Sequence, residues 1–207
     1  MYKKKSSAII LLSGGQDSTT CLYWCKKKFK KILALSFSFG QKHVKELECA
    51  KRICESNKID HIIIDLNILN AYKNSNNCIS GRNLFFLSFA ALAAKCYNFD
   101  SIVIGVSQQD YNTFPDCRED FIKALNVALN LAMDSNITIY TPLMNLKKED
   151  IWKLADDLGI IDIIKNETLT CYNGVIGNGC GQCNACQLRN SGYKKYYNSI
   201  KGGEDDE

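Results

Sequence analysis

One turn constrains the fold more than any other part of the sequence, because glycine, hydroxyl and acidic residues follow directly on a short apolar run. The turn reads Ser13-Gly14-Gly15-Gln16-Asp17-Ser18-Thr19-Thr20. The apolar run before it, at residues 8–12, and the residues after it are typical of a buried strand, a tight turn and a helix. Glycine lets a backbone approach a ligand closely, and N–H groups at a helix N-terminus attract phosphate. The spacing is neither G-x-G-x-x-G nor a Walker-type loop with its lysine, so it predicts another kind of phosphate-binding turn.

Apolar and β-branched runs alternate with helical patterns along most of the chain. The runs lie at residues 8–12, 32–37, 62–66, 102–106 and 137–141. Between them, residues 84–94 are apolar almost all round, as expected of a buried helix, and a helical stripe from Ile151 to Leu158 ends at Gly159. This alternation favours the α/β class, with a doubly wound parallel sheet covered by helices on both faces.

Polar side chains follow several of these predicted strands. In a parallel sheet, ligands bind at the carboxyl ends of the strands. The segments expected there are residues 13–20, 36–40, 105–110 and 141–142, together with Asp65. Arg82, Asp110 and Arg118 add charged groups to the same expected crevice. Each of them alone is explained as a turn residue or a surface ion-pair partner, but together they favour a ligand site.

Four of the eleven cysteines are clustered towards the end of the sequence. They are Cys171, Cys180, Cys183 and Cys186, spaced C-x8-C-x2-C-x2-C. This spacing, with several glycines to form turns, suits one tetrahedral zinc ion per chain. Four thiolates leave no open coordination position, so we expect a structural metal. Iron–sulfur ligation is the stronger alternative, and a disulfide framework is the weaker one because the cytosol disfavours disulfides.

The turn at residues 13–20 resembles the S-G-G-x-D-S signature of the PP-loop, or N-type, ATP pyrophosphatases. Members of that superfamily split ATP between the α and β phosphates and activate a substrate oxygen as an adenylate. The resemblance implies an adenine nucleotide alpha hydrolase-like fold that binds ATP. The residues expected around the ATP are Leu12, Ser13, Gly14, Gly15, Gln16, Asp17, Ser18, Thr19, Thr20, Cys21 and Leu22. Asp17 is the candidate for placing Mg²⁺ or orienting the pyrophosphate, since a hard cation prefers oxygen ligands.

The sequence predicts one main domain with a small appendage. We expect the ATP-binding α/β domain at residues 1–165, a zinc-binding segment packed on it at 166–200, and an acidic tail at 201–207. Net charge is +4, and the lysine runs at 26–28 and 30–31 lack interleaved aromatic residues, which favours a solvated face over a nucleic-acid patch. No apolar run reaches membrane-spanning length and no signal peptide is expected, so the sequence favours a cytoplasmic protein without direct nucleic-acid or membrane binding.

Further motifs, in order along the chain, narrow the resemblance. They are S-F-x-x-G-Q-[KR]-H from Ser36, G-R-N from Gly81, G-V-S-x-x-D-Y from Gly105, P-D-C-R from Pro115, T-P-L-M-x-L-x-K from Thr141 and C-Y-N-G from Cys171. With the cysteine spacing, they are similar to the 7-cyano-7-deazaguanine synthase family over residues 8–193. The resemblance implies a homodimeric enzyme of queuosine precursor synthesis. Such an enzyme uses ATP and ammonia to convert 7-carboxy-7-deazaguanine to the nitrile.

The chemistry of that substrate suggests roles for the charged residues. The base presents N–H donors on its Watson–Crick edge, which the carboxylate of Asp110 would accept. Arg82 or Arg118 would hold the substrate carboxylate in a bidentate pair. The sequence also departs from the usual family pattern, with Ser38 and Phe39 for Asp and Tyr, Lys42 for Arg, and Ser80 for Pro.

Two functions of other classes compete with this interpretation. A PP-loop sulfur transferase that modifies tRNA would use some cysteines for chemistry and would bind tRNA with strong salt dependence. A non-enzymatic zinc-ribbon module that binds nucleic acid would leave residues 8–160 and the phosphate turn without a role.

Overall fold

The computed structural model of the chain describes residues 5–40, 45–72, 79–111 and 113–201. Within them, five parallel strands form a single sheet in the order β3-β2-β1-β4-β5. The strands are β1 (Lys5–Leu11), β2 (Phe29–Ser38), β3 (Asp60–Asp65), β4 (Ser101–Val103) and β5 (Thr138–Tyr140). The predicted parallel α/β sheet is therefore confirmed, although β4 and β5 are shorter than the runs that predicted them.

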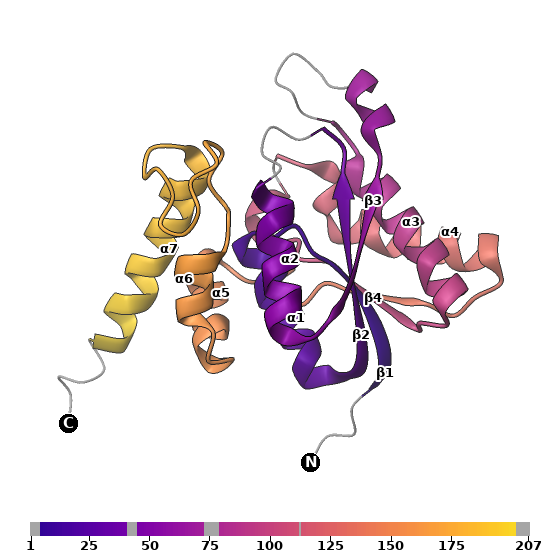
Figure 1. Cartoon of the computed structure of the whole chain (residues 1–207), viewed down its shortest axis with the longest axis horizontal. Helices are drawn as coiled ribbons and strands as arrows, with labels where there is room; N and C mark the ends of the chain where they lie inside the picture. The colour runs from indigo at the N-terminus through magenta and orange to yellow at the C-terminus, as the bar shows by residue number, and fades with distance from the viewer. Residues whose placement is uncertain (1–4, 41–44, 73–78, 112, 202–207) are drawn as a thin grey trace.

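Helices cover both faces of the sheet, as the alternating pattern predicted (Figure 1). They are α1 (Gln16–Lys28), α2 (Lys45–Asn57), α3 (Arg82–Tyr97), α4 (Glu119–Met133), α5 (Lys148–Asp157), α6 (Ile161–Glu167) and α7 (Asn184–Lys201). Helices α1 and α2 lie on one face, and α3 and α4 lie on the other. Three short 3-10 helices are η1 (Asn67–Tyr72), η2 (Gln108–Asp110) and η3 (Pro115–Cys117).

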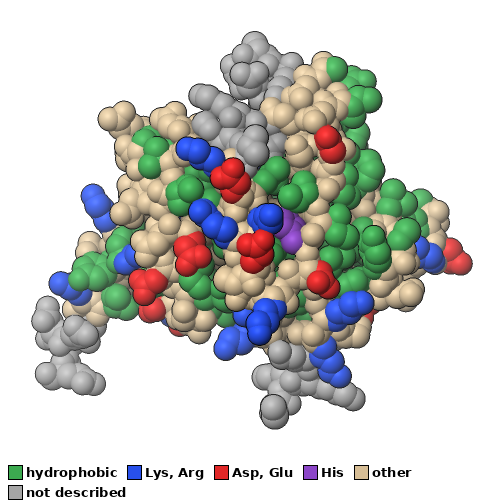
Figure 2. Space-filling model, viewed as in Figure 1, with side chains coloured by type: hydrophobic (Ala, Val, Ile, Leu, Met, Phe, Trp, Pro, Cys, Tyr) green, Lys and Arg blue, Asp and Glu red, His purple; other side chains and the backbone are tan. Residues whose placement is uncertain are grey.

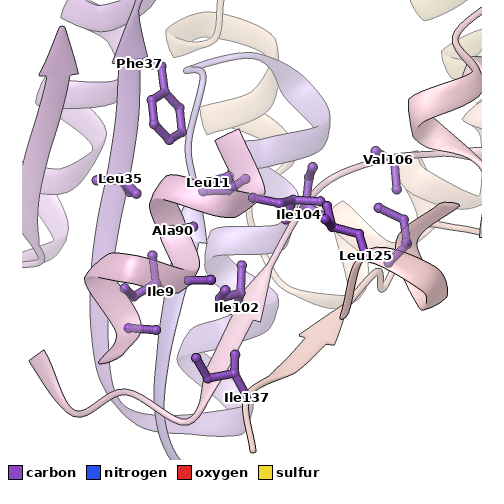
Figure 3. Close-up of a cluster of buried hydrophobic side chains, with 14 of the residues drawn as sticks. Ile9, Leu11, Leu35, Phe37, Ala90, Ile102, Ile104, Val106, Leu125 and Ile137 are labelled. Atoms are coloured by element: carbon purple, nitrogen blue, oxygen red, sulfur yellow. The ribbon is translucent and has the colours of Figure 1, made fainter. Parts of the chain in front are cut away.

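The central strand β1 separates two hydrophobic cores. Ile9 and Leu11 point into the core under α3 and α4, where Figure 3 shows them with Ile102 and Leu125. Ala8, Ile10 and Leu12 alternate with them and contribute to the core under α1 and α2. Because a strand buried on both faces presents apolar side chains at every position, β1 reads as an unbroken apolar run in the sequence.

The winding of the sheet places the turn at residues 13–15 at the centre of one sheet edge. From β1 the chain winds outward through β2 and β3, and then crosses back to β4 on the other side of β1. The carboxyl ends of β1 and β4 therefore lie at the point where the winding reverses, which is where open α/β sheets bind ligands. Residues 13–15 leave β1 at this point.

The last three helices form a small core of their own beside α1. Helix α7 packs along α5, and Trp152, Ile164 and Tyr196 are buried between α5, α6 and α7. The expected division at residues 165/166 falls within α6, and the appendage shares this core with α5. The division into domains therefore stays a prediction.

The expectation that residues 84–94 form a helix buried all round is wrong for one side of α3. Leu87, Ala90 and Ala91 are buried against the sheet, but Leu84 is exposed and Leu92 is 52% exposed. Within the described part of one chain, the sheet covers one side of α3, and the opposite side is exposed to solvent. Hydrophobic side chains accordingly gather on the side of α3 and α4 in Figure 2.

Charges are mixed on the face formed by α1 and α2. Figure 2 shows Lys and Arg side chains interspersed with Asp and Glu there, without a broad basic patch on this face. Lys26, from one of the lysine runs, donates to Asn57 Oδ1 at 2.5 Å. A membrane-spanning helix is not found in the described ranges, where no helix is both long and apolar enough. His43 and Lys42 of the S-F-x-x-G-Q-[KR]-H motif, and the acidic tail, lie outside the described residues.

Candidate functional site

The turn after β1 needs glycine at Gly14. Its φ is +83°, and a Cβ there would lie 2.3 Å from the carbonyl oxygen of Glu46 and 2.9 Å from the amide nitrogen of Ala50. Both contacts are with backbone, which cannot move aside cheaply. Gly14 therefore lets the turn pack directly against α2, and any side chain would push the turn out of place.

Hydroxyl groups close the turn from within. Ser13 N donates to Ser18 Oγ at 3.2 Å, and the two serine hydroxyl oxygens are 3.0 Å apart. Gly15 N lies 3.4 Å from Ser13 Oγ. These bonds pair the N–H groups of Ser13 and Gly15 within the turn and hold the backbone at the start of α1, and the N-terminus of a helix favours an anion.

The end of β4 also approaches the start of α1. A Cβ at Gly105 would lie 3.1 Å from the Asp17 carbonyl carbon and 3.1 Å from Ser18 N. The glycine of the G-V-S-x-x-D-Y motif thus allows the crossover strand to reach the first turn of the helix. Segments about 90 residues apart in the sequence meet at the reversal point of the sheet.

Four buried polar atoms at the start of α1 have no partner among the described residues. They are Gln16 Nε2, Gln16 Oε1, Asp17 Oδ1 and Thr19 Oγ1. Buried polar groups in folded proteins are nearly always paired, because an unpaired one costs about 1–3 kcal/mol. A free carboxylate oxygen on Asp17 is the donor type that Mg²⁺ prefers, so the residue fits the role predicted for it.

The other oxygen of Asp17 pairs with Lys148 at the N-terminus of α5. Lys148 Nζ lies 2.5 Å from Asp17 Oδ2, and the two side chains are only 13% and 20% exposed. Lys148 is the final residue of the T-P-L-M-x-L-x-K motif, for which the sequence suggested no role. The pair joins α5 to the turn and places an ammonium group beside it.

The segment before the first clustered cysteine is bonded to the turn at two points. Leu169 N donates to Gly14 O at 2.9 Å, and Gln16 N donates to Thr170 Oγ1 at 3.2 Å. Thr170 is followed by Cys171. The turn and the cysteine cluster are therefore neighbours in space, although more than 150 residues separate them in the sequence.

The four predicted cysteines do come together. All four Sγ atoms lie within 4.8 Å of one another, with Cys180–Cys186 and Cys183–Cys171 each at 4.0 Å. Zinc–sulfur bonds of about 2.3 Å in a tetrahedron place sulfurs about 3.8 Å apart. The cluster thus fits a single metal ion held by four thiolates, and its four ligands leave no open position.

Hydrogen bonds from nearby backbone N–H groups favour the thiolate form of two of these cysteines. Backbone N–H groups of Cys183 and Gln182 lower the pKa of Cys180 to about 6. Burial raises the pKa of Cys171, but the N–H groups around it outweigh burial and the pKa is lowered. For Cys186, burial dominates and raises the pKa to about 12. Since metals bind thiolates, the lowered pair are the readier ligands.

The three residues predicted to hold the substrate differ in their burial and in their contacts. The charges of Arg82, Asp110 and Lys148 all act on the hydroxyl of Tyr172, whose pKa is raised mainly by burial. Arg82 lies over the ring of Phe114, and Phe114 N donates to the Asp110 carbonyl oxygen at 2.8 Å, so Arg82 and Asp110 lie in one neighbourhood. Asp110 also accepts hydrogen bonds from the backbone N and the hydroxyl of Ser107, each at 2.9 Å, which closes its own turn.

Arg118 contacts the residue that follows Asp110. It is exposed, and its Nε donates to the carbonyl oxygen of Tyr111 at 3.2 Å. It borders a surface hollow with Tyr111, Glu119 and Asp120. Arg82 instead lies over the ring of Phe114, with 5.6 Å between the guanidinium carbon and the ring centroid. Both arginines therefore lie near Asp110, and Arg82 is the less exposed of the two.

Sequence patterns do not indicate a role for four residues that the structure brings to the site: Lys148, Thr170, Tyr172 and Arg189. Lys148 and Tyr172 stand inside family motifs, and Arg189 follows the last clustered cysteine by one helical turn. Their position in those motifs was the available signal. Their contacts are with distant segments, so the sequence pattern alone does not indicate what they do.

Comparison with known proteins identifies the family. The sequence model described as "Queuosine biosynthesis protein QueC" matches residues 7–78 and 71–197. A protein of Clostridium acetobutylicum named 7-cyano-7-deazaguanine synthase is 52% identical over 201 residues, which cover 88% of this chain and 90% of the relative.

Solved structures agree on the fold. An NH3-dependent NAD synthetase from Campylobacter jejuni is similar with a TM-score of 0.50 and 18% identity, over 79% of this chain and 69% of that one. The U34-tRNA thiolase NcsA from Methanococcus maripaludis, solved with its [4Fe-4S] cluster, gives a TM-score of 0.51 and 14% identity, over 76% of this chain and 58% of that one. At these identities, the two likenesses show the fold alone. The family match and the 52% identity over nearly the full length establish that this chain belongs to the QueC family of queuosine biosynthesis proteins.

Proposed function

We propose that this chain is an ATP-dependent carbon–nitrogen ligase that converts 7-carboxy-7-deazaguanine and ammonia to 7-cyano-7-deazaguanine. The observation that carries the proposal is the 52% identity to a 7-cyano-7-deazaguanine synthase over 90% of that relative's length. The product would be a precursor of the queuosine found in tRNA, in keeping with the description of the family.

The first stage activates the substrate acid. A carboxylate is a poor acyl donor because oxide is a poor leaving group, so its oxygen attacks the α-phosphate of ATP and pyrophosphate leaves. The N-terminus of α1 and the ammonium of Lys148 are placed to stabilise the charge that develops on the phosphates. Ammonia then attacks the acyl carbon, which releases AMP and a proton and leaves the amide.

The second stage activates the amide in the same way. The amide oxygen attacks the α-phosphate of another ATP, pyrophosphate and an N–H proton leave, and an adenylated imidate results. Loss of AMP and the remaining N–H proton forms the nitrile. One turn therefore serves both activations, and the chemistry needs no covalent nucleophile from the protein.

Asp110 and Arg82 would hold the substrate. The Asp110 carboxylate would accept the N–H donors of the deazaguanine edge, and the Arg82 guanidinium would pair with the substrate carboxylate. Their common contact with Phe114 supports these two roles. Arg118 is the less favoured partner, because it faces Tyr111 and the start of α4.

Two metals complete the proposal. Asp17 Oδ1, buried and unpartnered among the described residues, would hold Mg²⁺, which would neutralise phosphate charge when bound. Cys171, Cys180, Cys183 and Cys186 would hold one Zn²⁺ per chain, which would stabilise the fold. Iron found in the purified protein by elemental analysis would instead favour an iron–sulfur site.

The resemblance also suggests a homodimer in the cytoplasm. Exposed apolar side chains on α3 and α4, including Leu84, Leu92 and Leu131, support a second copy as the cover for this face. Sedimentation of wild-type protein against Leu92→Lys protein would test this, because a buried charge at the interface would shift the protein to monomer.

The direct test incubates the protein with ATP, Mg²⁺, ammonia and 7-carboxy-7-deazaguanine and follows the products by mass spectrometry. We expect the nitrile, with twice as much AMP as nitrile, and no product without ammonia. Asp17→Asn protein serves as the matched control and should release little pyrophosphate. ATP turnover that appears only when tRNA is added would favour the sulfur-transferase alternative instead.

A further inference from the structure

Arg189 in α7 is a buried guanidinium with only neutral partners. It is 4% exposed, and no carboxylate in the described ranges lies within ion-pair distance of it. It donates to Thr168 Oγ1 at 3.1 Å, to Thr170 Oγ1 at 3.2 Å and to the Ile164 carbonyl oxygen at 2.5 Å. Burying an arginine without a counter-ion is costly, so its place at this point of the fold requires a reason.

One of these bonds leads directly to the ATP turn. Thr170 Oγ1 accepts from Arg189 and also from the backbone N–H of Gln16, the first residue of α1. A hydroxyl oxygen has two lone pairs, so both donors can share it. Arg189 thus fixes the oxygen that in turn fixes the N-terminal peptide of α1.

Thr170 and Arg189 both lie close in sequence to cysteines of the cluster. Cys171 follows Thr170 directly, and Cys186 precedes Arg189 by one turn of α7. Both cysteines are buried, at 2% and 1% exposed. The cysteine cluster therefore sets where Thr170 and Arg189 lie, and these two residues set where the Gln16 N–H points.

The charge of Arg189 adds to this geometry. Burial lowers the pKa of Arg189, and the charges of Cys186, in its thiolate form, and of Asp17 oppose that shift. A zinc ion with four thiolates carries a net negative charge. A Cys186 thiolate in such a centre would be one of the two charges that act on the guanidinium.

We propose that Arg189 is a positioning residue for ATP, and that it acts through Thr170 to couple the cysteine cluster to the turn at residues 13–16. The metal would then have a second effect besides stabilising the fold, because it would hold the turn and the first residue of α1 in the position that binds phosphate. This inference rests on the proposed ATP site.

The test compares hydroxyl variants that keep the size of the side chain. Thr170→Val removes the shared oxygen, and Thr170→Ser keeps it. Thr168→Val is the matched control, since it removes another bond to Arg189 without touching Gln16. For each protein, zinc content is measured by elemental analysis, and binding of a non-hydrolysable ATP analogue with Mg²⁺ is measured by calorimetry.

We expect all three variants to retain the zinc of the wild-type protein. Thr170→Val should weaken analogue binding roughly three- to tenfold, the loss expected for one hydrogen bond, while Thr170→Ser and Thr168→Val stay within about twofold of wild type. Arg189→Met should weaken binding at least as much as Thr170→Val. If Arg189→Met does not fold, the comparison of Thr170→Val with Thr170→Ser still tests the coupling.

Two results would overturn the coupling. One is Thr170→Val protein that binds the analogue as tightly as wild type with its zinc in place. The other is equal weakening in Thr168→Val, which would point to a general loss of packing. Failure of the proposed ATP site is distinguishable, because wild-type protein itself would then not bind the analogue, and the inference would fall with it.

Discussion

Lys148 Nζ lies 2.5 Å from Asp17 Oδ2, which joins the first turn of α5 to the first turn of α1 across 131 positions of sequence. The pair is mostly buried, so its charges are screened less than those of a surface salt bridge. It places one cation and one carboxylate at the edge of the turn that we propose for ATP. Both residues therefore contribute to the fold, and we expect both to contribute to the chemistry.

Replacing Lys148 by methionine should separate these two contributions. The uncompensated Asp17 carboxylate should lower the free energy of unfolding by about 1–3 kcal/mol, less than the loss for a fully buried pair. Loss of the ammonium should lower kcat/KM for pyrophosphate release by roughly 10- to 100-fold. Lys153→Met, an exposed position on the same helix, is the control for both measurements. Equal activity in the two variants would remove Lys148 from the phosphate site.

Gly192 in α7 allows Lys148 to reach that position. A Cβ at Gly192 would lie 2.5 Å from Lys148 Cβ and 3.0 Å from its carbonyl carbon. Gly192→Ala gains about 1 kcal/mol of helix propensity but pays about 1–3 kcal/mol for the overlap, so we expect a net loss and a Tm lower by about 2–6 °C. Ser191→Ala, exposed and next to it, should keep or raise the Tm. A higher Tm for Gly192→Ala would show that α5 and α7 can accommodate the added methyl group without strain.

The parts of the site that the sequence predicted are those that a short stretch of chain determines. Gly14, Ser18 and the four cysteines act within local spacings, and a strand followed by a glycine turn can be read directly from residues 8–20. The sequence therefore predicts the turn, the sheet and the cysteine cluster.

The remaining parts depend on contacts between distant segments. Nothing near Lys148 indicates that its partner is Asp17, and nothing near Arg189 indicates that it will be buried against Thr170. Asp110 was predicted as a ligand for the base, and local pattern did not reveal that it also closes its own turn through Ser107. The exposed side of α3 was missed because an apolar run does not say which element will cover it.

The double role of Asp110 can be separated by a pair of variants. Asp110→Asn keeps an acceptor for Ser107 but loses the charge that would hold the base, so the KM for 7-carboxy-7-deazaguanine should rise roughly tenfold or more. Ser107→Ala removes one of the turn bonds and keeps the carboxylate, so its KM should change by less than about threefold. Steady-state kinetics with saturating ATP measure both. A larger effect for Ser107→Ala would assign Asp110 to the turn alone.

Two glycines of the cysteine segment offer a matched test of metal binding. Gly179 and Gly181 have φ of +71° and +73°, so alanine is strained at both. A Cβ at Gly179 would lie 2.4 Å from Cys186 Sγ, whereas a Cβ at Gly181 has nothing within 4 Å. We expect Gly179→Ala to lose most of its zinc by elemental analysis and Gly181→Ala to retain it. Full zinc in Gly179→Ala would mean that Cys186 is not an essential ligand.

The stability of the sheet should depend on pH through His61 in β3. Its Nε2 lies 2.7 Å from Ser36 Oγ, and burial, which is the main cause, lowers its pKa from 6.5, with Lys51 adding to the effect and Glu55 opposing it. The folded state therefore binds fewer protons than the unfolded state as pH falls below 6.5. Stability from this residue is complete above that pH and is lost as pH falls through the lowered pKa.

Chemical unfolding at several pH values between about 7.5 and 5 should reveal this loss, with a steeper decline in wild type than in His61→Gln. Glutamine keeps an N–H donor for Ser36 Oγ but does not titrate, so it removes the proton linkage with little change to the bond. Lys51→Met offers a second check, because removing that positive charge should raise the pKa of His61. The stability of Lys51→Met protein should therefore decline less steeply with falling pH than that of wild type. Identical slopes for wild type and His61→Gln would place the origin of any acid sensitivity outside β3.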